Sequence, residues 1–275
     1  MKNQVDCVAF KLFELPIYWY AIIITIAIIM ALWLSIREAL RVGLKEDDMV
    51  FFLFWALPIG IIGARFYYIL FNINLFLTDP IQVFNIRNGG LAIYGGLIAS
   101  VIVLIVYTRH YSIDTWLFLD VIAPNVMLAQ SIGRWGNFMN HEAYGAETSH
   151  LFLKSLYLPN FIINNMYIND KYRHPTFFYE SIWTLLGVIL IVFCRKKYPF
   201  KRGEIFLIYL IWYSFGRFFI EKFRMDSLYL IGEIRVSQLL SALFFFLGTF
   251  LFYYRHKHLH IELYERDKGL NKAII

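Results

Sequence analysis

The sequence predicts an all-α polytopic membrane protein with seven transmembrane helices and a small extracytoplasmic head. Of its 275 residues, 59% are hydrophobic and only 17% are charged, whereas a soluble domain carries about a quarter charged residues. The mean hydropathy is +0.56. Several apolar runs also reach the roughly 20 residues that a helix needs to cross a bilayer core. These observations argue against a soluble fold.

Seven apolar runs define the expected spans. The first begins near Pro16 and stays apolar to Ile36, which is too long for the core of a signal peptide, and no small-residue cleavage site follows it. We therefore interpret it as a retained span. The expected spans are residues 17–36, 49–72, 90–107, 116–134, 176–194, 204–222 and 236–254.

The basic residues indicate how the spans are oriented. Dense clusters occur in one set of loops and at the C-terminal end, and the positive-inside rule places them in the cytoplasm. The clusters are Arg37, Arg41 and Lys45; Arg109; Arg195, Lys196, Lys197, Lys201 and Arg202; and Arg255, Lys257, Arg266, Lys268 and Lys272. The N-terminus is then outside and the C-terminus cytoplasmic. The net charge of +6 therefore reports orientation and not binding of nucleic acid.

We expect one membrane-embedded domain over residues 1–275. The only long connection, residues 136–174, mixes polar and apolar residues and is expected to form an extracytoplasmic cap. Cys7 and Cys194 are the only cysteines, and they can build neither a disulfide framework nor a thiolate metal site. The histidine-rich stretch 255–260 is interpreted as a solvated tail, so no metal and no cofactor are expected.

Charged residues lie in or beside the spans, although each costs roughly 2.5–3.5 kcal/mol at mid-bilayer on insertion scales. They are Arg65, Asp120, Arg134, Glu180, Arg217, Glu221 and Lys222. With the orientation above, most share one depth in the outer half of the bilayer. Asp120 is the exception and is expected to cap or pair locally. Structural ion pairs are an equally good interpretation for Asp120 and Glu221.

Arginines gathered at this depth suit an anionic lipid headgroup, because a guanidinium grips phosphate oxygens at two points. Tyr213, Arg217 and Glu221 follow at i, i+4 and i+8 on one helical face. Two interpretations remain open. Glu221 orients Arg217 toward a phosphate, or the pair only holds this helix in place.

The stretch Gly133–Gly145 is the most informative in the chain. Its glycines are expected to break the helix and to let non-helical backbone line a polar cavity. Arg134, Asn137, Asn140 and Glu142 would face that cavity. A plain polar turn is the alternative.

These residues resemble the prolipoprotein diacylglyceryl transferase family. Stretch 133–145 carries the resemblance most specifically, and weaker matches follow in order over most of the chain. They are Trp19-Tyr20; Gly63–Arg65; Gly89–Gly96; Asp120 with Pro124; His174–Thr176 with Tyr179-Glu180; and Tyr213 through Arg217, Glu221 and Arg224.

The resemblance implies a seven-span bundle in the bacterial plasma membrane, with its active site toward the outer half of the bilayer. It also implies a reaction that moves diacylglyceryl from phosphatidylglycerol to the lipobox cysteine in the signal peptide of a prolipoprotein. The products are a thioether and glycerol phosphate. The partners would be this lipid, the prolipoprotein and the lipid bilayer, without nucleic acid.

On this resemblance, Arg134 and Arg217 stabilise the departing phosphate. Tyr94 stands where many members carry a histidine, so a histidine base cannot be transferred to this chain. Either Tyr94 activates the thiol or no side chain there acts as a base. The expected substrate-binding residues are Tyr20, Arg65, Asn137, Asn140, Glu142, Gly145, His174, Glu180 and Tyr213. For His174, which precedes Pro175, a helix-entry role is an equally good interpretation.

Three other classes of protein compete with this interpretation. A transporter also carries intramembrane charges, but it places its site near the midplane and often shows repeated halves. Another membrane acyltransferase would normally show a buried His-Asp or Cys constellation. A non-catalytic receptor-like bundle leaves the stretch Gly133–Gly145 unexplained.

Overall fold

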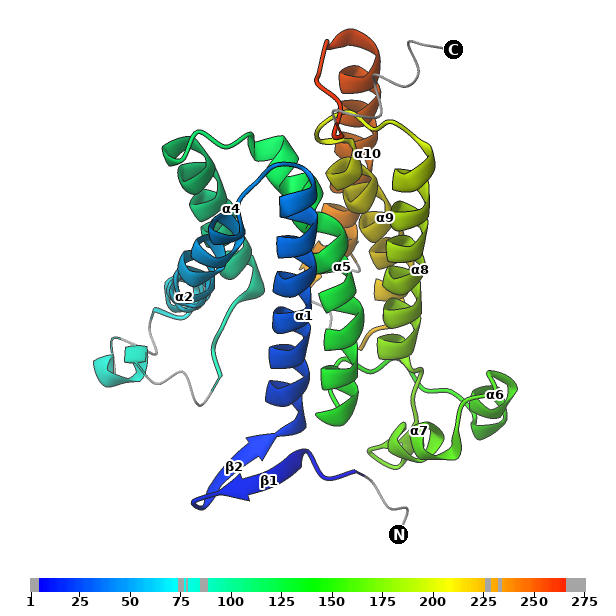
Figure 1. Cartoon of the computed structure of the whole chain (residues 1–275). Coiled ribbons are helices and arrows are strands. Elements are labelled where there is room, and N and C mark those ends of the chain that lie inside the picture. The colour runs from blue at the N-terminus through cyan, green and yellow to red at the C-terminus, as the bar shows by residue number, and fades with distance from the viewer. Residues whose placement is uncertain are drawn as a thin grey trace. The chain divides into compact units, whose positions relative to one another are not determined.

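The computed structural model describes residues 5–73, 77, 79–84, 89–225, 229–231 and 234–265. The described chain is mostly helical (Figure 1). It forms two compact units, one of Met1–Leu34 with Asp120–Ile275 and one of Ser35–Leu119.

Seven long helices coincide with the seven predicted apolar runs. They are α1 (Trp19–Arg41), α2 (Glu46–Phe71), α4 (Ile93–His110), α5 (Thr115–Met139), α8 (Thr176–Lys197), α9 (Glu204–Glu221) and α10 (Val236–His258). The shorter helices are η1 (Pro80–Phe84), α6 (His150–Ser155) and α7 (Asn160–Asn165).

Six of these helices are long and apolar enough to cross a membrane: α1, α2, α4, α5, α8 and α10. The chain is therefore a polytopic helical membrane protein. Helix α9 differs because its 18 residues include Glu204, Arg217 and Glu221. These three charges lower its hydropathy.

Three short antiparallel hairpins were not foreseen in the all-α prediction. They are β1 (Val8–Leu12) with β2 (Leu15–Tyr18), β3 (Tyr167–Ile168) with β4 (Lys171–Tyr172), and β5 (Tyr229–Ile231) with β6 (Ile234–Arg235). The first hairpin leads directly into α1 and turns at Phe13 and Glu14, which both have positive φ. Strands of two to five residues carry too little alternation to be recognised by period.

The predicted helix break at Gly133 and Gly136 is wrong, because α5 continues through both residues to Met139. The two glycines instead allow close packing of α5 on α1. A Cβ atom at Gly136 would lie 2.9 Å from the ring of Tyr20, and one at Gly133 would lie 3.2 Å from Ile24. The missing side chains therefore make room for a neighbouring helix, which is a common use of small residues between membrane helices.

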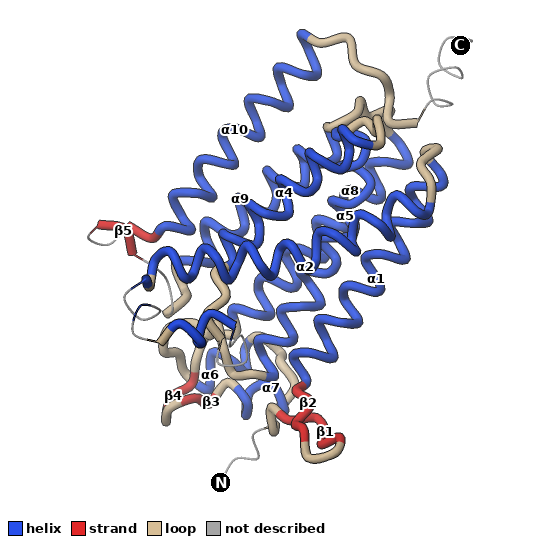
Figure 2. Tube along the Cα trace, turned by 90° about the vertical axis from the view of Figure 1, so that its left-hand side faces the viewer, coloured by secondary structure: helices blue, strands red, loops and turns tan. Residues whose placement is uncertain are grey.

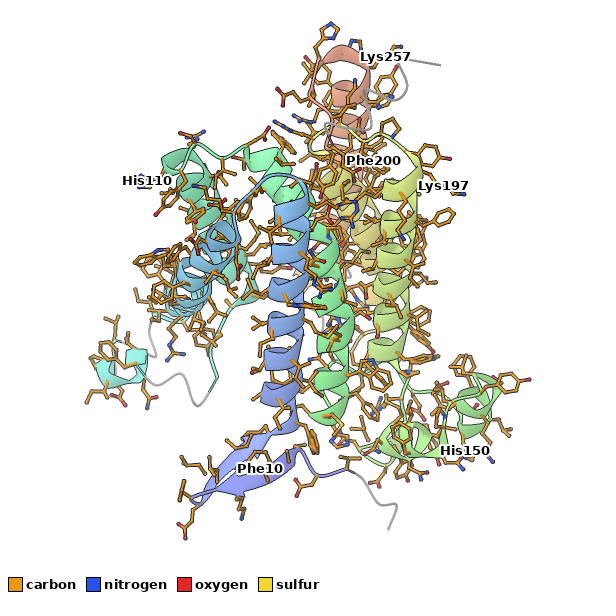
Figure 3. The ribbon with its side chains drawn as sticks, in the orientation of Figure 1. Phe10, His110, His150, Lys197, Phe200 and Lys257 are labelled. Atoms are coloured by element: carbon orange, nitrogen blue, oxygen red, sulfur yellow. The ribbon has the colours of Figure 1, made fainter. Side chains whose placement is uncertain are left out.

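In the larger unit, α1, α5 and α8 run side by side (Figures 1 and 2). The β1–β2 hairpin, α6 and α7 lie at one end of these helices, and the C-terminal end of α10 lies at the other. Figure 3 places Phe10 and His150 at the first end and Lys197 and Lys257 at the second. This distribution separates the cap from the basic clusters at the ends of α8 and α10.

The cap segment has a hydrophobic core that continues into the long helices. Phe138 of α5 stacks on Phe177 of α8, with ring centroids 4.5 Å apart. The core consists of Phe138, Leu153, Leu158, Ile162, Ile163, Met166, Ile168 and Phe177. The cap is thus anchored on the ends of α5 and α8 that carry the conspicuous polar residues.

Asp120 caps the start of α9, which confirms the prediction of a local role. Its carboxylate accepts the backbone N–H of Gly203 at 2.5 Å and that of Phe206 at 2.8 Å. The first N–H groups of a helix have no partner within the helix, so a buried carboxylate satisfies them and also complements the helix dipole. The interaction ties α5 to α9 at the end opposite the cap.

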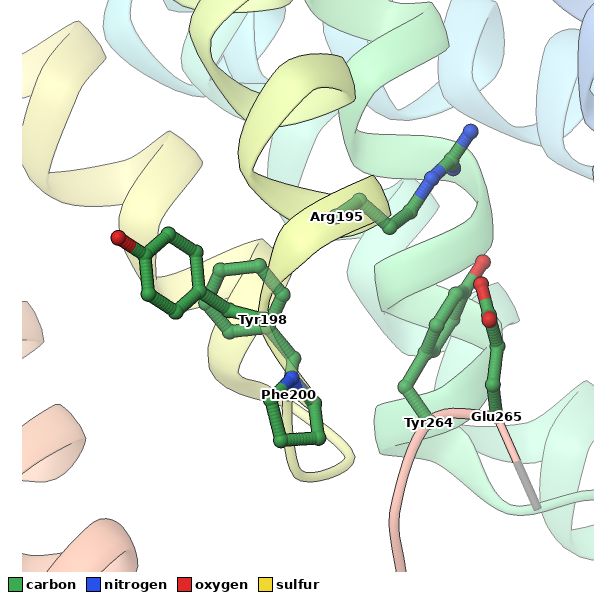
Figure 4. A pocket seen from close by; sticks show the side chains of 6 residues that line it. Arg195, Tyr198, Phe200, Tyr264 and Glu265 are labelled. Carbon is green, nitrogen blue, oxygen red and sulfur yellow. The ribbon is translucent and has the colours of Figure 1, made fainter. Parts of the chain in front are cut away.

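At this same end, the C-terminal segment folds back beside the α8–α9 connection. The N–H of Tyr264 donates to the carbonyl of Phe200 at 2.8 Å, and the N–H of Arg202 donates to that of Glu262 at 3.0 Å. The hollow between them is lined by Arg195, Tyr198, Pro199, Phe200, Tyr264 and Glu265 (Figure 4). The two backbone hydrogen bonds hold the C-terminal segment against the α8–α9 connection.

Two tryptophans join α8 to α9. The indole N–H of Trp183 donates to the carbonyl of Trp212 at 2.9 Å, and that of Trp212 donates to the carbonyl of Trp183 at 2.8 Å. Their rings stack with centroids 4.4 Å apart. Gly187 and Gly216 provide the space, since a Cβ atom on either would collide with the opposite indole. This reciprocal clasp fixes α9 against α8, and Gly216, which accommodates the indole of Trp183, directly precedes Arg217.

In the smaller unit, α2 and α4 cross at a second pair of glycines. A Cβ atom at Gly63 would lie 2.4 Å from that of Ala99, and one at Gly95 would lie 2.3 Å from that of Tyr67. Close approach increases van der Waals contact, which matters in a bilayer because lipid tails are as apolar as the side chains themselves.

We expect Gly216→Ala to lower the free energy of unfolding by about 1–3 kcal/mol, the usual cost of overpacking a tight contact. The new methyl group would lie 2.1 Å from Nε1 of Trp183, whose two-way hydrogen bonding prevents it from moving aside. Thermal unfolding of the purified protein in detergent measures the effect. Gly248→Ala on α10 is the matched control, because its methyl group would meet only the side chains of Ile211 at 3.1 Å and Leu210 at 3.5 Å. Equal melting temperatures for the two variants would contradict this account of the clasp.

Candidate active site

The candidate site is built around one carboxylate that two arginines share. Glu180 lies in the second turn of α8. One of its carboxylate oxygens pairs with Nε of Arg134 from α5, and the other pairs with Nη1 of Arg217 from α9. Nη2 of Arg217 also pairs with Glu221 at 2.7 Å. Two of the predicted catalytic residues thus converge from separate helices, and the Arg217–Glu221 pair predicted from their spacing is present.

Further hydrogen bonds hold α5 against α8 beside this carboxylate. The hydroxyl of Ser131 donates to the carbonyl of Ser181 at 2.8 Å, and the indole N–H of Trp135 donates to the hydroxyl of Ser181 at 3.1 Å. These partners flank Arg134 and Glu180 in sequence. The ion pair is therefore held on a rigid contact between two helices.

Among the described residues of this cluster, positive charges outnumber negative charges. Glu180 is almost fully buried, with 6% of its side chain exposed, whereas Arg134 keeps 20% exposed. Arg224 also interacts favourably with Glu180, and Nη1 of Arg235 donates to the backbone carbonyl of Glu221. Among the described residues, four guanidinium groups thus lie near two carboxylates. Their excess positive charge, in surroundings of low dielectric, favours an anion.

Arg134 retains donor capacity for that anion. Nε of Arg134 pairs with Glu180, and Nη1 lies 3.5 Å from Oδ1 of Asn137 one turn later on α5. Within the described part of the chain, no partner is recorded for its Nη2 group. A guanidinium that is oriented by one carboxylate and open on its other edge is well placed to bind a phosphate.

The backbone leaves the helix only after Met139. His141 and Ala143 have positive φ angles of 53° and 54°, and the N–H of Glu142 donates back to the carbonyl of Asn137 at 2.9 Å. This loop places Asn140 and Glu142 beside the end of α5, where their side chains lie 3.4 Å apart. The predicted departure from helical geometry therefore occurs at residues 140–145 and not at the earlier glycines.

Gly145 lies where three backbone segments meet. Its N–H donates to the carbonyl of His174 at 2.9 Å, and the next N–H, of Ala146, donates to that of Phe223 at 2.7 Å. A Cβ atom at Gly145 would lie 2.6 Å from that of His174. The structure thus explains this glycine by backbone packing, and its predicted contact with substrate remains a prediction.

His174 connects the cap to the first turn of α8. Its Nδ1 lies 3.2 Å from the hydroxyl of Tyr179, and its backbone N–H donates to the carbonyl of Ala146 at 3.0 Å. Burial lowers the pKa of the imidazole below its ordinary value of 6.5. Through its contact with Tyr179, the residue before Glu180, His174 helps to position the start of α8. This contact fits a role at the entry of the helix.

The predicted tyrosines flank the arginines. Tyr20 packs on Gly136 of α5, two residues after Arg134. Tyr213 precedes Arg217 by one turn of α9, and its ring stacks on that of Tyr209. The contact of both tyrosines with a headgroup remains a prediction.

Arg65 and Tyr94 lie in the unit of residues 35–119. Arg65 donates to four backbone carbonyls, with Nε to Val83 at 3.0 Å and Nη1 to Gly89 and Gly90 at 3.0 and 2.9 Å, while Nη2 contacts Gln82. Four of its five donors therefore organise the segment after α2. Tyr94 lies in the first turn of α4 and is half-buried. The substrate roles of Arg65 and Tyr94 remain predictions from the sequence.

Arg224 and Arg235 belong to the cluster, although neither was predicted as a site residue. Both had a recognisable signal, because they are basic residues on the side that the sequence predicts to be extracytoplasmic, where the positive-inside rule expects few. An arginine on that side, close to the ends of charged helices, is better explained by an anionic partner than by orientation in the membrane.

Comparison with known proteins identifies the family of this chain. A family model described as prolipoprotein diacylglyceryl transferase matches residues 7–254. The chain belongs to the prolipoprotein diacylglyceryl transferase family. It is therefore a transferase of lipoprotein maturation, as the resemblance predicted.

Several relatives carry the name phosphatidylglycerol–prolipoprotein diacylglyceryl transferase. The protein from Enterococcus faecalis is 56% identical over 273 residues, which cover 99% of this chain and 98% of the relative. The one from Lactobacillus johnsonii is 50% identical over 271 residues, or 98% of each chain. The one from Bacillus cytotoxicus is 49% identical over 238 residues, 86% of this chain and 87% of the relative.

Glu180→Gln should destabilise the protein by about 3–5 kcal/mol, because it leaves two buried guanidinium groups without their common counter-charge. Glu147→Gln is the matched control. Glu147 pairs with Lys171 at 2.5 Å, but both side chains are more than half exposed, and an exposed pair contributes at most about 1 kcal/mol. Thermal unfolding in detergent compares the two. A loss no larger for Glu180→Gln than for Glu147→Gln would show that the arginines do not depend on Glu180.

The lowered pKa of His174 predicts the sign of a pH dependence. Since the unfolded chain binds the proton more readily, His174 should reduce stability as the pH falls below 6.5 and should have no effect above about pH 7. Melting temperatures of wild type and His174→Gln at several pH values test this, because their difference cancels the other histidines. A difference that stays constant with pH would show that His174 titrates alike in both states.

Proposed function

We propose that this chain transfers the diacylglyceryl group of phosphatidylglycerol to the lipobox cysteine in the signal peptide of a prolipoprotein. The observation that carries this proposal is the convergence of Arg134 and Arg217 on Glu180. The printed names of the relatives supply the two substrates. The site supplies a reason for the lipid, because an excess of guanidinium groups favours a phosphodiester.

In the proposed step, the cysteine sulfur attacks the glycerol carbon that bears the phosphate. A C–S bond forms as the C–O bond to phosphate breaks, and the thiol proton ends on the departing glycerol phosphate or on solvent. Arg134 and Arg217 stabilise the charge that grows on the phosphate oxygens. Asn137, Asn140 and Glu142, with Tyr20 and Tyr213, position the headgroup beside them.

An apolar groove of about 360 Å³ lies next to the arginine cluster. Tyr179 and Ile220 line it, and each is adjacent in sequence to a carboxylate of the cluster. The other lining residues are Leu156, Phe178, Ile182, Trp183 and Leu186. A lipid whose phosphate contacts Arg134 or Arg217 can place an acyl chain along this groove, where it gains van der Waals contact with the apolar lining.

We propose that α9 is the seventh span and that the two compact units act as one domain in the bacterial plasma membrane. Residues 136–174 would then form the extracytoplasmic cap, with the N-terminus outside, the C-terminus cytoplasmic and the active site toward the outer half of the bilayer. The position of the cap opposite Lys197 and Lys257 supports this orientation (Figure 3).

The decisive assay combines purified protein, phosphatidylglycerol vesicles and a lipobox peptide, and follows the mass of the peptide. The peptide should gain one diacylglyceryl group, and a Cys→Ser peptide should gain none. Replacing phosphatidylglycerol with phosphatidylcholine tests the choice of donor. An unchanged peptide mass with a folded preparation would refute the proposal.

Arg134→Ala should lower the rate of transfer by about 100-fold or more, the usual effect of removing a donor that stabilises transition-state charge. Arg134→Lys should recover only part of the loss, because an ammonium group cannot contact Glu180 and a phosphate with one planar fork. Arg109→Ala, at an exposed position in the last turn of α4, is the control. Transfer at the wild-type rate by Arg134→Ala would remove this residue from the mechanism.

A further inference from the structure

The thiol of Cys7 lies beside an imidazole and a carboxamide of the cap. Sγ of Cys7 lies 3.7 Å from Nδ1 of His141, and Nε2 of His141 lies 3.3 Å from Oδ1 of Asn165. The three residues come from the N-terminal segment, the loop after α5 and the end of α7. None of them belongs to the arginine cluster.

The orientation of Asn165 determines which imidazole nitrogen carries hydrogen. Its Nδ2 donates to the carbonyl of Phe161 at 2.7 Å, and its Oδ1 accepts the N–H of Val5 at 2.7 Å. Since Oδ1 also faces His141, Nε2 must be the donor. In the neutral ring, Nδ1 is then an acceptor and is directed at the thiol of Cys7.

The backbone holds this arrangement in place. Asn165 is 2% exposed. His141 has a left-handed φ of 53°, and the carbonyl of Cys7 accepts the N–H of Trp19 at 3.0 Å. Cys7 is partly exposed. A nucleophile, a base and a group that orients the base are thus assembled at a position open to small reagents.

We propose that Cys7, His141 and Asn165 form a reactive-thiol site for small disulfides and other soft electrophiles, and that its modification slows lipid transfer. In the exchange, the thiol proton moves to Nδ1 of His141 and the sulfur attacks one disulfide sulfur. The S–S bond of the reagent breaks as a new S–S bond to Cys7 forms. The departing thiolate recovers the proton.

The effect on transfer follows from the position of His141 between Asn140 and Glu142. A group attached to Cys7 occupies the space between sulfur and imidazole and pushes His141 away. Asn165 contacts the other side of the ring, so the ring cannot shift in that direction alone. The loop of residues 140–145 would therefore move with His141. This part of the inference rests on the proposed function, whereas the reactivity of the thiol does not.

The chemical test uses the full chain carrying Cys194→Ser, so that Cys7 is the only thiol. Its reaction with dithiodipyridine is followed by the absorbance of the released thiopyridone. His141→Gln should slow the reaction about tenfold, because a free thiol is only a few per cent thiolate near neutral pH. His150→Gln, a histidine of the same cap outside this cluster, should leave the rate unchanged.

A second comparison needs no variant of the cluster. Cys7 in the native Cys194→Ser protein should react faster than the same thiol in guanidinium chloride, although unfolding exposes it fully. A slower native reaction, or an equal rate in the folded His141→Gln protein, would overturn the proposal of a reactive thiol.

The functional test measures transfer to a lipobox peptide after alkylation with iodoacetamide and removal of the reagent. The alkylated Cys194→Ser protein should lose at least half of its transfer rate, whereas the Cys7→Ser, Cys194→Ser double variant should keep its rate after the same treatment. Full activity of the alkylated protein would refute the coupling to transfer. Absence of transfer before alkylation would instead count against the proposed function.

Discussion

The rest of the site depends on the sharing of Glu180 by Arg134 and Arg217. Two guanidinium groups that contact the same carboxylate repel each other strongly in surroundings of low dielectric, and neither would stay buried without a counter-charge. One carboxylate on α8 solves the problem for both and binds α5 and α9 to the same turn of α8. The ion pair thus connects three helices and orients the two groups that the proposed reaction requires.

This arrangement needs helices that approach each other closely, and small residues make that approach available. Gly136 lets Tyr20 of α1 lie against α5, while Gly187 and Gly216 admit the paired indoles of Trp183 and Trp212. The indole hydrogen bonds are directional, so they set the rotation of α9 as well as its distance from α8. Packing therefore fixes which face of α9 presents Arg217 to Glu180, and electrostatics then strengthens that choice.

The sequence predicted the long helices well, because an apolar run and a local cap such as Asp120 act within a short stretch of chain. It predicted that Gly133 and Gly136 would end a helix, and there it was wrong, since their role depends on α1, more than 100 residues earlier. The sharing of Glu180 was likewise beyond local pattern. Spacing along α9 predicts the Arg217–Glu221 pair, but only the fold brings Arg134 and Arg217 together at Glu180.

A shared carboxylate also bears on how the proposed reaction is favoured. In the lipid the phosphate is a diester with one negative charge, whereas the departing monoester approaches two near neutral pH. Glu180 and Glu221 offset part of the guanidinium charge, which weakens binding of the singly charged headgroup. The remaining positive field interacts more strongly as the second charge develops. Interactions that grow toward the transition state accelerate a reaction, whereas equally tight binding of the substrate does not.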